Sequence, residues 1–462
     1  MWRILLSAIA AISFLSSRSN ASILVPSKDP WYIQPNNISE YAPGEVIRSR
    51  QVSPQLEPFI SFPVNVSVKA VYQYLFRTTD SLGDAVGSAV TLLEPYNSDP
   101  SKLLGYQAFY DSASVDCSPS YTLRAKKQDL GFTVTGLNVS EDIPFVSTVL
   151  VIYQVFQRLT VHQIGAALNL GWWVFTTDYE GLEAEFTAGL QSGHAVLDSV
   201  RAVLNEGPQV GLSENPAYAL WGYSGGSLAS TWAAELQPAY APELNFAGVA
   251  VGGLTPNISS VLQTINNGSD AGLAFSGIVG QSRAYPNLTE WLEANLVPSK
   301  TAFFYEVASD CLSAASSAAS GQDLYTYFKD GEASFYQDVP QSIFKWSGQM
   351  GVHGTPTAPM FFYKAVGDEI SPVADTDALV KKYCAEGATI EYHRDLVGNH
   401  ESEAISGSAS ALEWLAERLN GEEVGSGCST KDVILSSLDL GTVVVLGEEL
   451  FTILETILGG ML

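Results

Sequence analysis

Short apolar runs and longer stretches with helical spacing follow one another along most of the chain. The apolar runs predict strands at residues 88–95, 103–109, 170–176, 218–221, 246–251 and 360–366. Helical spacing follows two of them, at residues 188–203 and 228–236. Strands that alternate with helices are typical of a parallel sheet covered on both faces. We therefore expect an α/β fold with a mostly parallel central sheet.

The N-terminus has a different pattern. One positive charge at Arg3 precedes an apolar run at residues 4–15, and small residues follow around residues 19–21. This order predicts a secretory signal peptide over residues 1–21. The alternative is a membrane anchor, which needs about 18 to 20 apolar residues. The run here is shorter, and Arg18 interrupts the sequence after it.

Composition narrows the class of protein and its partners. Apolar residues make up 46% of the 462 residues, which indicates a large core, and the net charge is −26. Such a surface repels nucleic acid phosphates and anionic lipid headgroups, so we expect no nucleic acid partner and no stable membrane insertion. No linker or internal repeat divides the chain, which favours a single core with one long insertion over separate domains.

Sequons and cysteines agree with export, so we expect a secreted, extracellular glycoprotein. The seven sequons begin at Asn20, Asn37, Asn65, Asn138, Asn257, Asn267 and Asn287. The four cysteines do not form a C-x-x-C pair and have no histidine at ligand spacing, so we expect no metal site. An even number in an oxidising compartment favours two disulfides, with three possible connectivities. The cysteines are Cys117, Cys311, Cys384 and Cys428.

A candidate nucleophile lies at the junction between a predicted strand and a predicted helix. Residues 222–226 read Gly-Tyr-Ser-Gly-Gly and match G-x-S-x-G. A serine hydroxyl that projects from a sheet needs a tight turn between strand and helix, and small flanking residues permit that turn. The alternative is an ordinary Gly/Ser-rich loop, but the flanking elements favour Ser224 as a nucleophile. The backbone N–H of Gly225 is then available to a developing oxyanion.

The serine needs a histidine base, and the chain has five histidines. The order serine, acid, histidine excludes His162 and His194, which precede Ser224, and disfavours His353. His400 follows a predicted strand at residues 389–395 and is the favoured base. His393, inside that strand, is the alternative.

The acid is expected after the strand at residues 360–366. Asp368 lies in the turn that follows this strand, where it would hold the imidazole tautomer. The nearby acids Glu369, Asp375 and Asp377 are interpreted as solvated residues of a turn and a helix start. A helix and a strand fit between Asp368 and His400, as the fold requires.

Several ordered motifs resemble those of the fungal secretory lipase family, of the Candida antarctica lipase A type. They lie at residues 42–50, 105–107, 111–112, 178–181, 186–189, 222–226, 240–245 and 367–370. The likeness covers about residues 40–430, and the ordered set is more specific than the pentapeptide alone. It implies an α/β-hydrolase fold and an enzyme that hydrolyses long-chain carboxylic esters, in some members with acyl transfer, without a cofactor.

The resemblance also implies roles for particular residues. Ser224, Asp368 and His400 form the catalytic triad, and Asp111 with the Gly225 backbone forms the oxyanion hole. The implied disulfides are Cys117–Cys311 and Cys384–Cys428. The core comprises residues 22–253 and 347–430, and the segment 254–346 is a mainly helical cap (lid). We expect the cap sequons Asn257, Asn267 and Asn287 to lie on its exposed outer face.

Residues 431–462 form an apolar tail that departs from the family. A helix packed on the core or a disordered end is the favoured interpretation. An amphipathic segment and a glycolipid-anchor signal are alternatives, and Glu448, Glu449 and Glu455 disfavour the anchor. The leading hypothesis is a monomeric lipase acting on lipid esters at an oil–water interface. The alternatives are a short-chain esterase or other secreted serine hydrolase, and an inactive binding protein.

Overall fold

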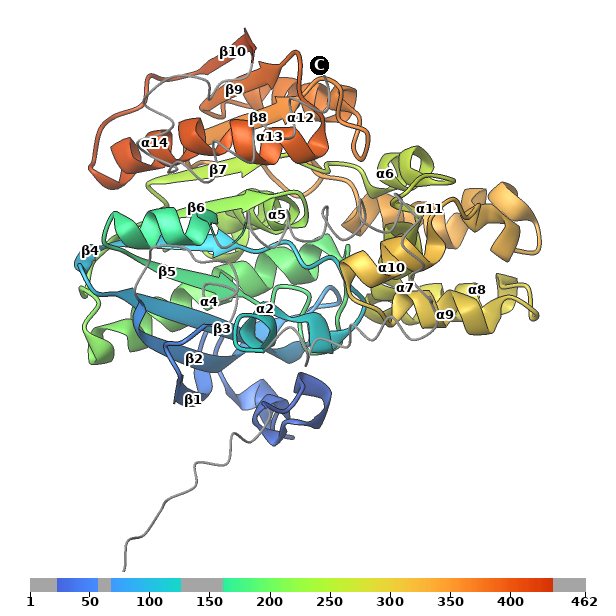
Figure 1. Cartoon of the computed structure of the whole chain (residues 1–462), viewed down its shortest axis with the longest axis horizontal. Coiled ribbons are helices and arrows are strands. Elements are labelled where there is room, and N and C mark those ends of the chain that lie inside the picture. Colours follow the sequence, from blue (N-terminus) through green and yellow to red (C-terminus); the bar gives the residue numbers. More distant parts are fainter. Residues whose placement is uncertain (1–22, 57–67, 126–159, 161, 435–462) are drawn as a thin grey trace, which may run out of the picture.

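The computed structural model describes residues 23–56, 68–125, 160 and 162–434. Within them a ten-stranded sheet has the order β1-β2-β3-β5-β4-β6-β7-β8-β9-β10 and runs through the whole core (Figure 1). The strands are β1 (Val46–Val52), β2 (Val68–Thr79), β3 (Ala85–Pro95), β4 (Asp99–Gln107), β5 (Trp172–Thr177), β6 (Ala217–Tyr223), β7 (Gly248–Gly252), β8 (Met360–Ala365), β9 (Ile390–Asp395) and β10 (Cys428–Val433).

The direction of the strands changes once across the sheet. The pairs β1–β2, β2–β3 and β3–β5 are antiparallel, and every pair from β5–β4 to β9–β10 is parallel. The expected mostly parallel α/β sheet is therefore confirmed. The strands β1, β2 and β10 were not predicted. In β2 most residues of both faces are buried, so the alternation that marks a half-exposed strand is absent.

Helices cover both faces of the sheet. On one face α4 (Gly189–Val210), α5 (Gly225–Tyr240) and α12 (Val373–Ala385) share an apolar cluster with the sheet. On the other face α13 (His400–Ser406) and α14 (Ser408–Leu419) share a second cluster. The helix α4 continues beyond the predicted end at Val203 and includes Pro208 in its last turn. Gly207 has no Cβ to clash with the proline ring, which relieves the usual restriction on the residue before proline.

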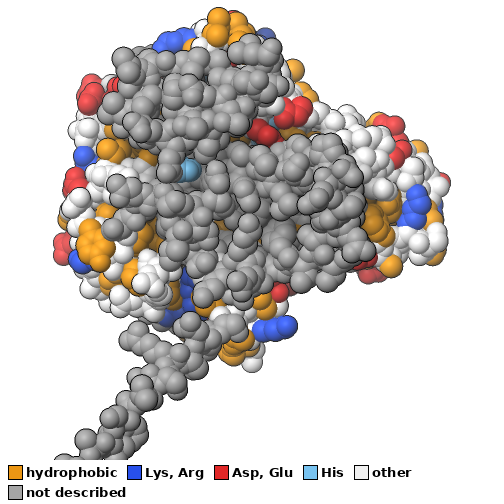
Figure 2. Space-filling view, viewed as in Figure 1, with side chains coloured by type: hydrophobic (Ala, Val, Ile, Leu, Met, Phe, Trp, Pro, Cys, Tyr) orange, Lys and Arg blue, Asp and Glu red, His pale blue; other side chains and the backbone are white. Residues whose placement is uncertain are grey.

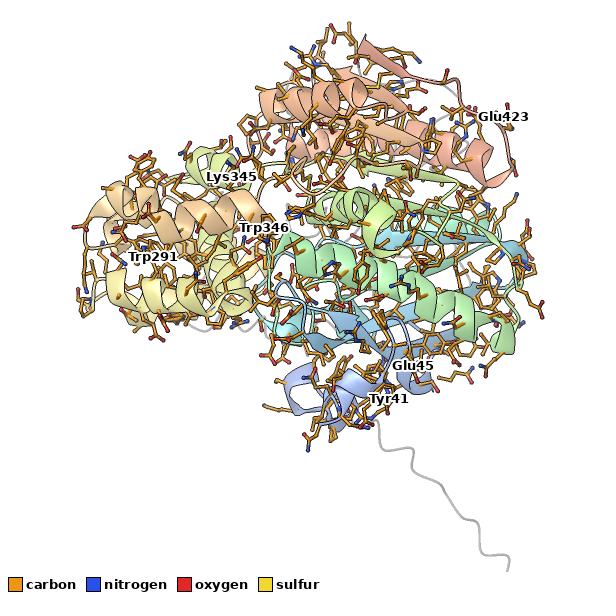
Figure 3. All side chains as sticks on the ribbon, turned by 180° about the vertical axis from the view of Figure 1, so that it is seen from behind. Tyr41, Glu45, Trp291, Lys345, Trp346 and Glu423 are labelled. Atoms are coloured by element: carbon orange, nitrogen blue, oxygen red, sulfur yellow. A yellow bond between two sulfur atoms is a disulfide. The ribbon has the colours of Figure 1, made fainter. Side chains whose placement is uncertain are left out.

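The segment between β7 and β8 is helical and has its own apolar cluster. It contains α6 (Ile258–Ile265), α7 (Ala271–Ala284), α8 (Pro286–Asn295), α9 (Thr301–Ala308), α10 (Leu312–Ala319) and α11 (Asp338–Ser347), and we call it the helical insertion. In Figure 1 it forms a lobe to one side of the sheet. Its neck is closed by an isolated antiparallel bridge between Asn257 and Gln349. Seen from behind, Trp346 lies at the junction with the core and Trp291 within the lobe (Figure 3).

The features that predict export are only partly covered by the described residues. The signal peptide, the sequons at Asn20, Asn65 and Asn138, and residues 435–462 of the tail lie outside the described residues. The side chains of Asn37, Asn267 and Asn287 are exposed. Asn257 differs from the expectation, because it is half-buried and its side chain accepts a hydrogen bond from Ser259 N at the start of α6.

The surface of the described residues carries many acidic side chains. Asp and Glu side chains are scattered along the margin of the face in Figure 2, in keeping with the net charge of −26. None of the helices in the described ranges is both long and apolar enough to cross a bilayer.

Candidate active site

Ser224 occupies the turn between β6 and α5. Its φ of +52° lies in the left-handed region, which costs free energy in a residue other than glycine. Both flanking glycines are needed for the close approach. A Cβ at Gly222 would lie 2.2 Å from Gly226 O, and one at Gly226 would lie 1.9 Å from Gln107 O in β4. The turn therefore holds the Ser224 side chain at the carboxyl end of β6, as the G-x-S-x-G pattern predicts.

His400 connects Ser224 to Asp368. Ser224 Oγ lies 2.9 Å from His400 Nε2, and His400 Nδ1 lies 2.7 Å from Asp368 Oδ2. All three side chains are buried. The structure thus brings together the three residues expected to form the triad, from β6–α5, the turn after β8 and the start of α13.

The backbone around His400 is held on several sides. His400 is the first residue of α13, and Asn399 forms a reciprocal capping box with Ser402. Tyr223, next to Ser224 in the sequence, donates a hydrogen bond to the His400 carbonyl at 2.6 Å. Glu369 accepts one from the His400 N–H at 2.9 Å, so this exposed acid has a structural role that its pattern did not predict. These contacts fix the imidazole relative to Ser224.

The Asp368 carboxylate has four donors. Oδ1 accepts hydrogen bonds from the N–H groups of Ile370 and Ser371, and Oδ2 lies 2.7 Å from both His400 Nδ1 and Lys364 Nζ. Burial alone would raise the pKa of Asp368, but the charges of His400 and Lys364 hold it well below its ordinary value. Burial lowers the pKa of His400, and the Asp368 carboxylate outweighs that effect, so its pKa is raised. Asp368 is therefore ionised and favours the imidazolium form.

Asp111 lies beside Ser224 and Gly225 in the loop after β4. A Cβ on Gly225 would lie 1.9 Å from Asp111 Oδ1, so the carboxyl group sits directly over the glycine. Burial raises the pKa of Asp111 to about 7, and Oδ1 has no hydrogen-bond partner among the described residues. Its φ of +42° places the backbone in the left-handed region. The residue named by the family resemblance is thus next to Ser224, although its sequence context alone indicated only a turn acid.

His393, His194 and His353 make contacts with other residues. His393, the alternative base, is in β9 and its Nε2 lies 2.9 Å from Glu391 Oε1. His194 stacks on Tyr240, and His353 bonds to the Trp346 carbonyl. His400 is therefore the histidine that meets Ser224.

An apolar pocket opens at Ser224. About 650 Å³ of space, part of it open to solvent, lies between the core and the helical insertion. Asp111, Ser224 and Gly225 form its polar end, and the remaining wall is mostly apolar. The wall residues are Phe186, Thr187, Leu228, Thr255, Ile258, Val261, Leu262, Ile265, Leu273, Ala274, Gly277, Ile278, Phe344 and Ile370. The pocket suits a long apolar group whose polar end reaches the serine.

Two disulfides join distant parts of the chain. Cys117, after β4, is bonded to Cys311 at the start of α10, and Cys384 in α12 is bonded to Cys428 in β10. These are the two pairs that the family resemblance implied. Over the ranges that the structure covers, no group of three or more His, Cys, Asp or Glu residues is arranged to hold a metal ion.

Comparisons with known proteins agree with an ester-hydrolysing site. The sequence model described as secretory lipase matches residues 149–427. Lipase A of Arthroderma benhamiae is 38% identical over 94% of this chain and 88% of its own length. A trichothecene C-3 esterase of Fusarium sporotrichioides is 34% identical over 93% of each chain.

A solved structure is similar over the same extent. Candida antarctica lipase A has 29% identity and a TM-score of 0.79, covering 94% of this chain and 96% of its own. These likenesses confirm the α/β-hydrolase fold and identify a carboxylic ester hydrolase. The chain belongs to the secretory lipase family.

Proposed function

We propose that this protein is a secreted lipase that cleaves carboxylic esters of lipids through an acyl-enzyme on Ser224. The proposal rests on the hydrogen-bonded residues Ser224, His400 and Asp368, with Ser224 at the polar end of an apolar pocket. Each link has hydrogen-bond length, and the base is oriented by a buried carboxylate, which is the arrangement that activates a serine hydroxyl.

The reaction follows from these parts. His400 Nε2 takes the proton of Ser224 as the hydroxyl oxygen attacks the ester carbonyl. The imidazolium that forms is stabilised by Asp368. It then gives its proton to the departing alcohol as the carbon–oxygen bond breaks, which leaves an acyl group on Ser224. Water, activated by the same histidine, releases the acid, and an alcohol in place of water gives acyl transfer.

The oxyanion is held at the start of α5. Gly225 is the first residue of this helix, so its N–H is not used within the helix and is available to the developing charge. Asp111 covers the same position. We assign Gly225 and Asp111 to the oxyanion hole on this basis.

The helical insertion acts as the cap of this site. The helices α6, α7 and α11 contribute most of the apolar wall of the pocket, so the acyl chain lies between core and cap. We therefore assign residues 22–253 and 347–430 to the core and 254–346 to the cap. Export through a signal peptide at residues 1–21 and a monomeric state complete the proposal.

A short-chain esterase is the second candidate. The identity of 34% to a trichothecene C-3 esterase extends over almost the whole chain and is close to the identity to a lipase. That relative is named for an ester outside the acylglycerols. The catalytic residues are shared by both candidates, so the length of the acyl chain distinguishes them.

Hydrolysis of p-nitrophenyl esters from acetate to palmitate tests the proposal. Wild type, Ser224→Ala and the control Ser230→Ala, a serine within the helix that follows Ser224, are compared. We expect strong turnover of long chains in wild type and Ser230→Ala, and loss of about 10³-fold or more in Ser224→Ala. Turnover confined to acetate and butyrate supports the esterase. No activity in wild type, or equal activity in Ser224→Ala, contradicts the proposed function.

A further inference from the structure

A buried lysine contacts the acid of the triad at the same oxygen as His400. Lys364 is in β8, four residues before Asp368, and its side chain is fully buried. Its Nζ lies 2.7 Å from Asp368 Oδ2 and 2.9 Å from the carbonyl oxygen of Leu254, after β7. The same carbonyl accepts a hydrogen bond from Ser371 Oγ at 3.0 Å. Lys364 therefore connects the ends of two neighbouring strands at the catalytic acid.

Packing does not explain a lysine at this position. Met360 and Phe362, on the same side of β8, belong to the apolar core, so the alternation calls for an apolar residue at 364. A buried cation costs free energy unless it is paired. Burial lowers the pKa of Lys364, and the Asp368 carboxylate opposes this effect. The position is thus occupied by a charge whose partner is the catalytic acid.

The surroundings of the pair are acidic. The other titratable groups that face Asp368, Lys364 or His400 come from the turn after β8, from α12, from α13, from β6 and from the loop after β4. They are Glu369, Asp375, Glu401, Glu403, Tyr223 and Asp111, with Asp395 beside Glu403. Each of these is an acid, so ionisation of any of them favours the imidazolium form of His400. Lys364 acts in the opposite direction and lowers the pKa of His400.

We propose that Lys364 is a positioning residue of the triad, which fixes the Asp368 carboxylate toward His400 and offsets part of its charge so that His400 remains a base at lower pH. The inference rests on the proposed function. Asp368 Oδ2 is held between two donors, so its orientation does not depend on His400 alone. His400 is a base only when neutral, and the positive charge of Lys364 extends the neutral form to lower pH.

The test compares kcat/KM against pH for wild type, Lys364→Met and Lys364→Arg. The acidic limb of this profile reports the pKa of the base in the free enzyme. We expect Lys364→Met to move that limb upward by about one pH unit or more, the scale of a nearby charge. One unit below the new limb, the neutral fraction of His400 then falls about fivefold, and the loss approaches about tenfold at lower pH. Lys364→Arg, which keeps the charge, should return the limb toward the wild-type position.

A control variant and a count of active sites distinguish a loss of the Lys364 charge from a loss of folded protein. Lys382→Met is the matched control, because Lys382 lies exposed on α12 and pairs with Glu386; its limb should stay in place. Rates are taken per serine that a phosphonate labels, so unfolded molecules do not contribute. An unchanged limb in Lys364→Met overturns the proposal. The proposal is also overturned if neither Lys364→Met nor Lys364→Gln has phosphonate-labelled serine at any pH. That result indicates that Lys364 is needed only for folding.

Failure of the inference is distinct from failure of the proposed function. If wild type has no esterase activity, or if Ser224→Ala keeps it, the proposed function is wrong. If wild type is active and sensitive to Ser224→Ala, but Lys364→Met has the wild-type limb, only the role of Lys364 is wrong.

Discussion

A methyl group at Gly226 would collide with the backbone of β4. The Cβ of an alanine would lie 1.9 Å from Gln107 O, whereas ordinary contact begins at 3.4 Å. Either α5 or the end of β4 must therefore move by about 1.5 Å, since a backbone carbonyl in the sheet has no rotamer to adopt. Ser224 immediately precedes α5, and the loop that contains Asp111 follows β4, so the movement increases the distance between Ser224 and Asp111.

The expected cost in Gly226→Ala has two parts. Overpacking of a tight site destabilises a protein by about 1 to 3 kcal/mol or more. A displacement of about 1 Å at reacting atoms lowers the rate by about 100-fold. We expect both effects, measured as the free energy of unfolding in urea and as kcat/KM on p-nitrophenyl butyrate.

Gly425→Ala is the control for the same substitution. Gly425 has no atom within 4 Å of its Cβ position, so its free energy of unfolding should change by less than about 1 kcal/mol and its kcat/KM should not change. The reasoning is refuted if Gly226→Ala matches Gly425→Ala in both measurements. A loss of stability without a loss of rate per phosphonate-labelled serine would refute the link between this contact and the position of Ser224.

Three further predictions concern the pocket, a disulfide and pH. Ala274→Leu adds volume to the pocket wall, so kcat/KM for palmitate should fall more than for acetate, and an equal fall would contradict the assignment of the acyl site. Cys117→Ser with Cys311→Ser should lower the free energy of unfolding by about 2 to 5 kcal/mol, and an unchanged thermal midpoint would disagree. Burial raises the pKa of Glu185 to about 8 from 4.5, so the stability that its protonated form contributes is fully present below about pH 4.5 and falls as pH rises toward 8. Glu185→Gln should flatten this fall by at least about 1.4 kcal/mol, the value of one pKa unit, in urea unfolding from pH 4 to 8.

The parallel half of the fold could be predicted because its strands are short, apolar and followed by helices. The stretch around Ser224 shows this well: a buried strand, a glycine-flanked turn and a helix are local features. The strands β1 and β10 could not be predicted in the same way. Each gains its structure from pairing with a partner distant in the chain, β2 and β9 respectively, and neither has a strong apolar run.

The site residues likewise differ in whether local sequence or distant packing places them. Ser224, Asp368 and His400 each follow a predicted element, so chain order placed them without a structure. Asp111 needed the family resemblance, because its nearness to Gly225 depends on the packing of two strands. Lys364 was not identified, since a charged residue at the end of an apolar run does not reveal that its side chain is buried against an acid.

The narrow neck of the helical insertion bears on how such enzymes diversify. The chain leaves the core after β7 and returns before β8, and the two ends pair directly, with Ile258 N bonded to Gly348 O and Met350 N to Pro256 O. The whole helical insertion therefore leaves and re-enters the core at the same point. The register between β7 and β8 therefore does not depend on the length of the segment that joins them. On the proposed assignment of the acyl site, most of the pocket wall is encoded in one contiguous stretch of the gene, and Ser224, Asp368 and His400 lie outside that stretch.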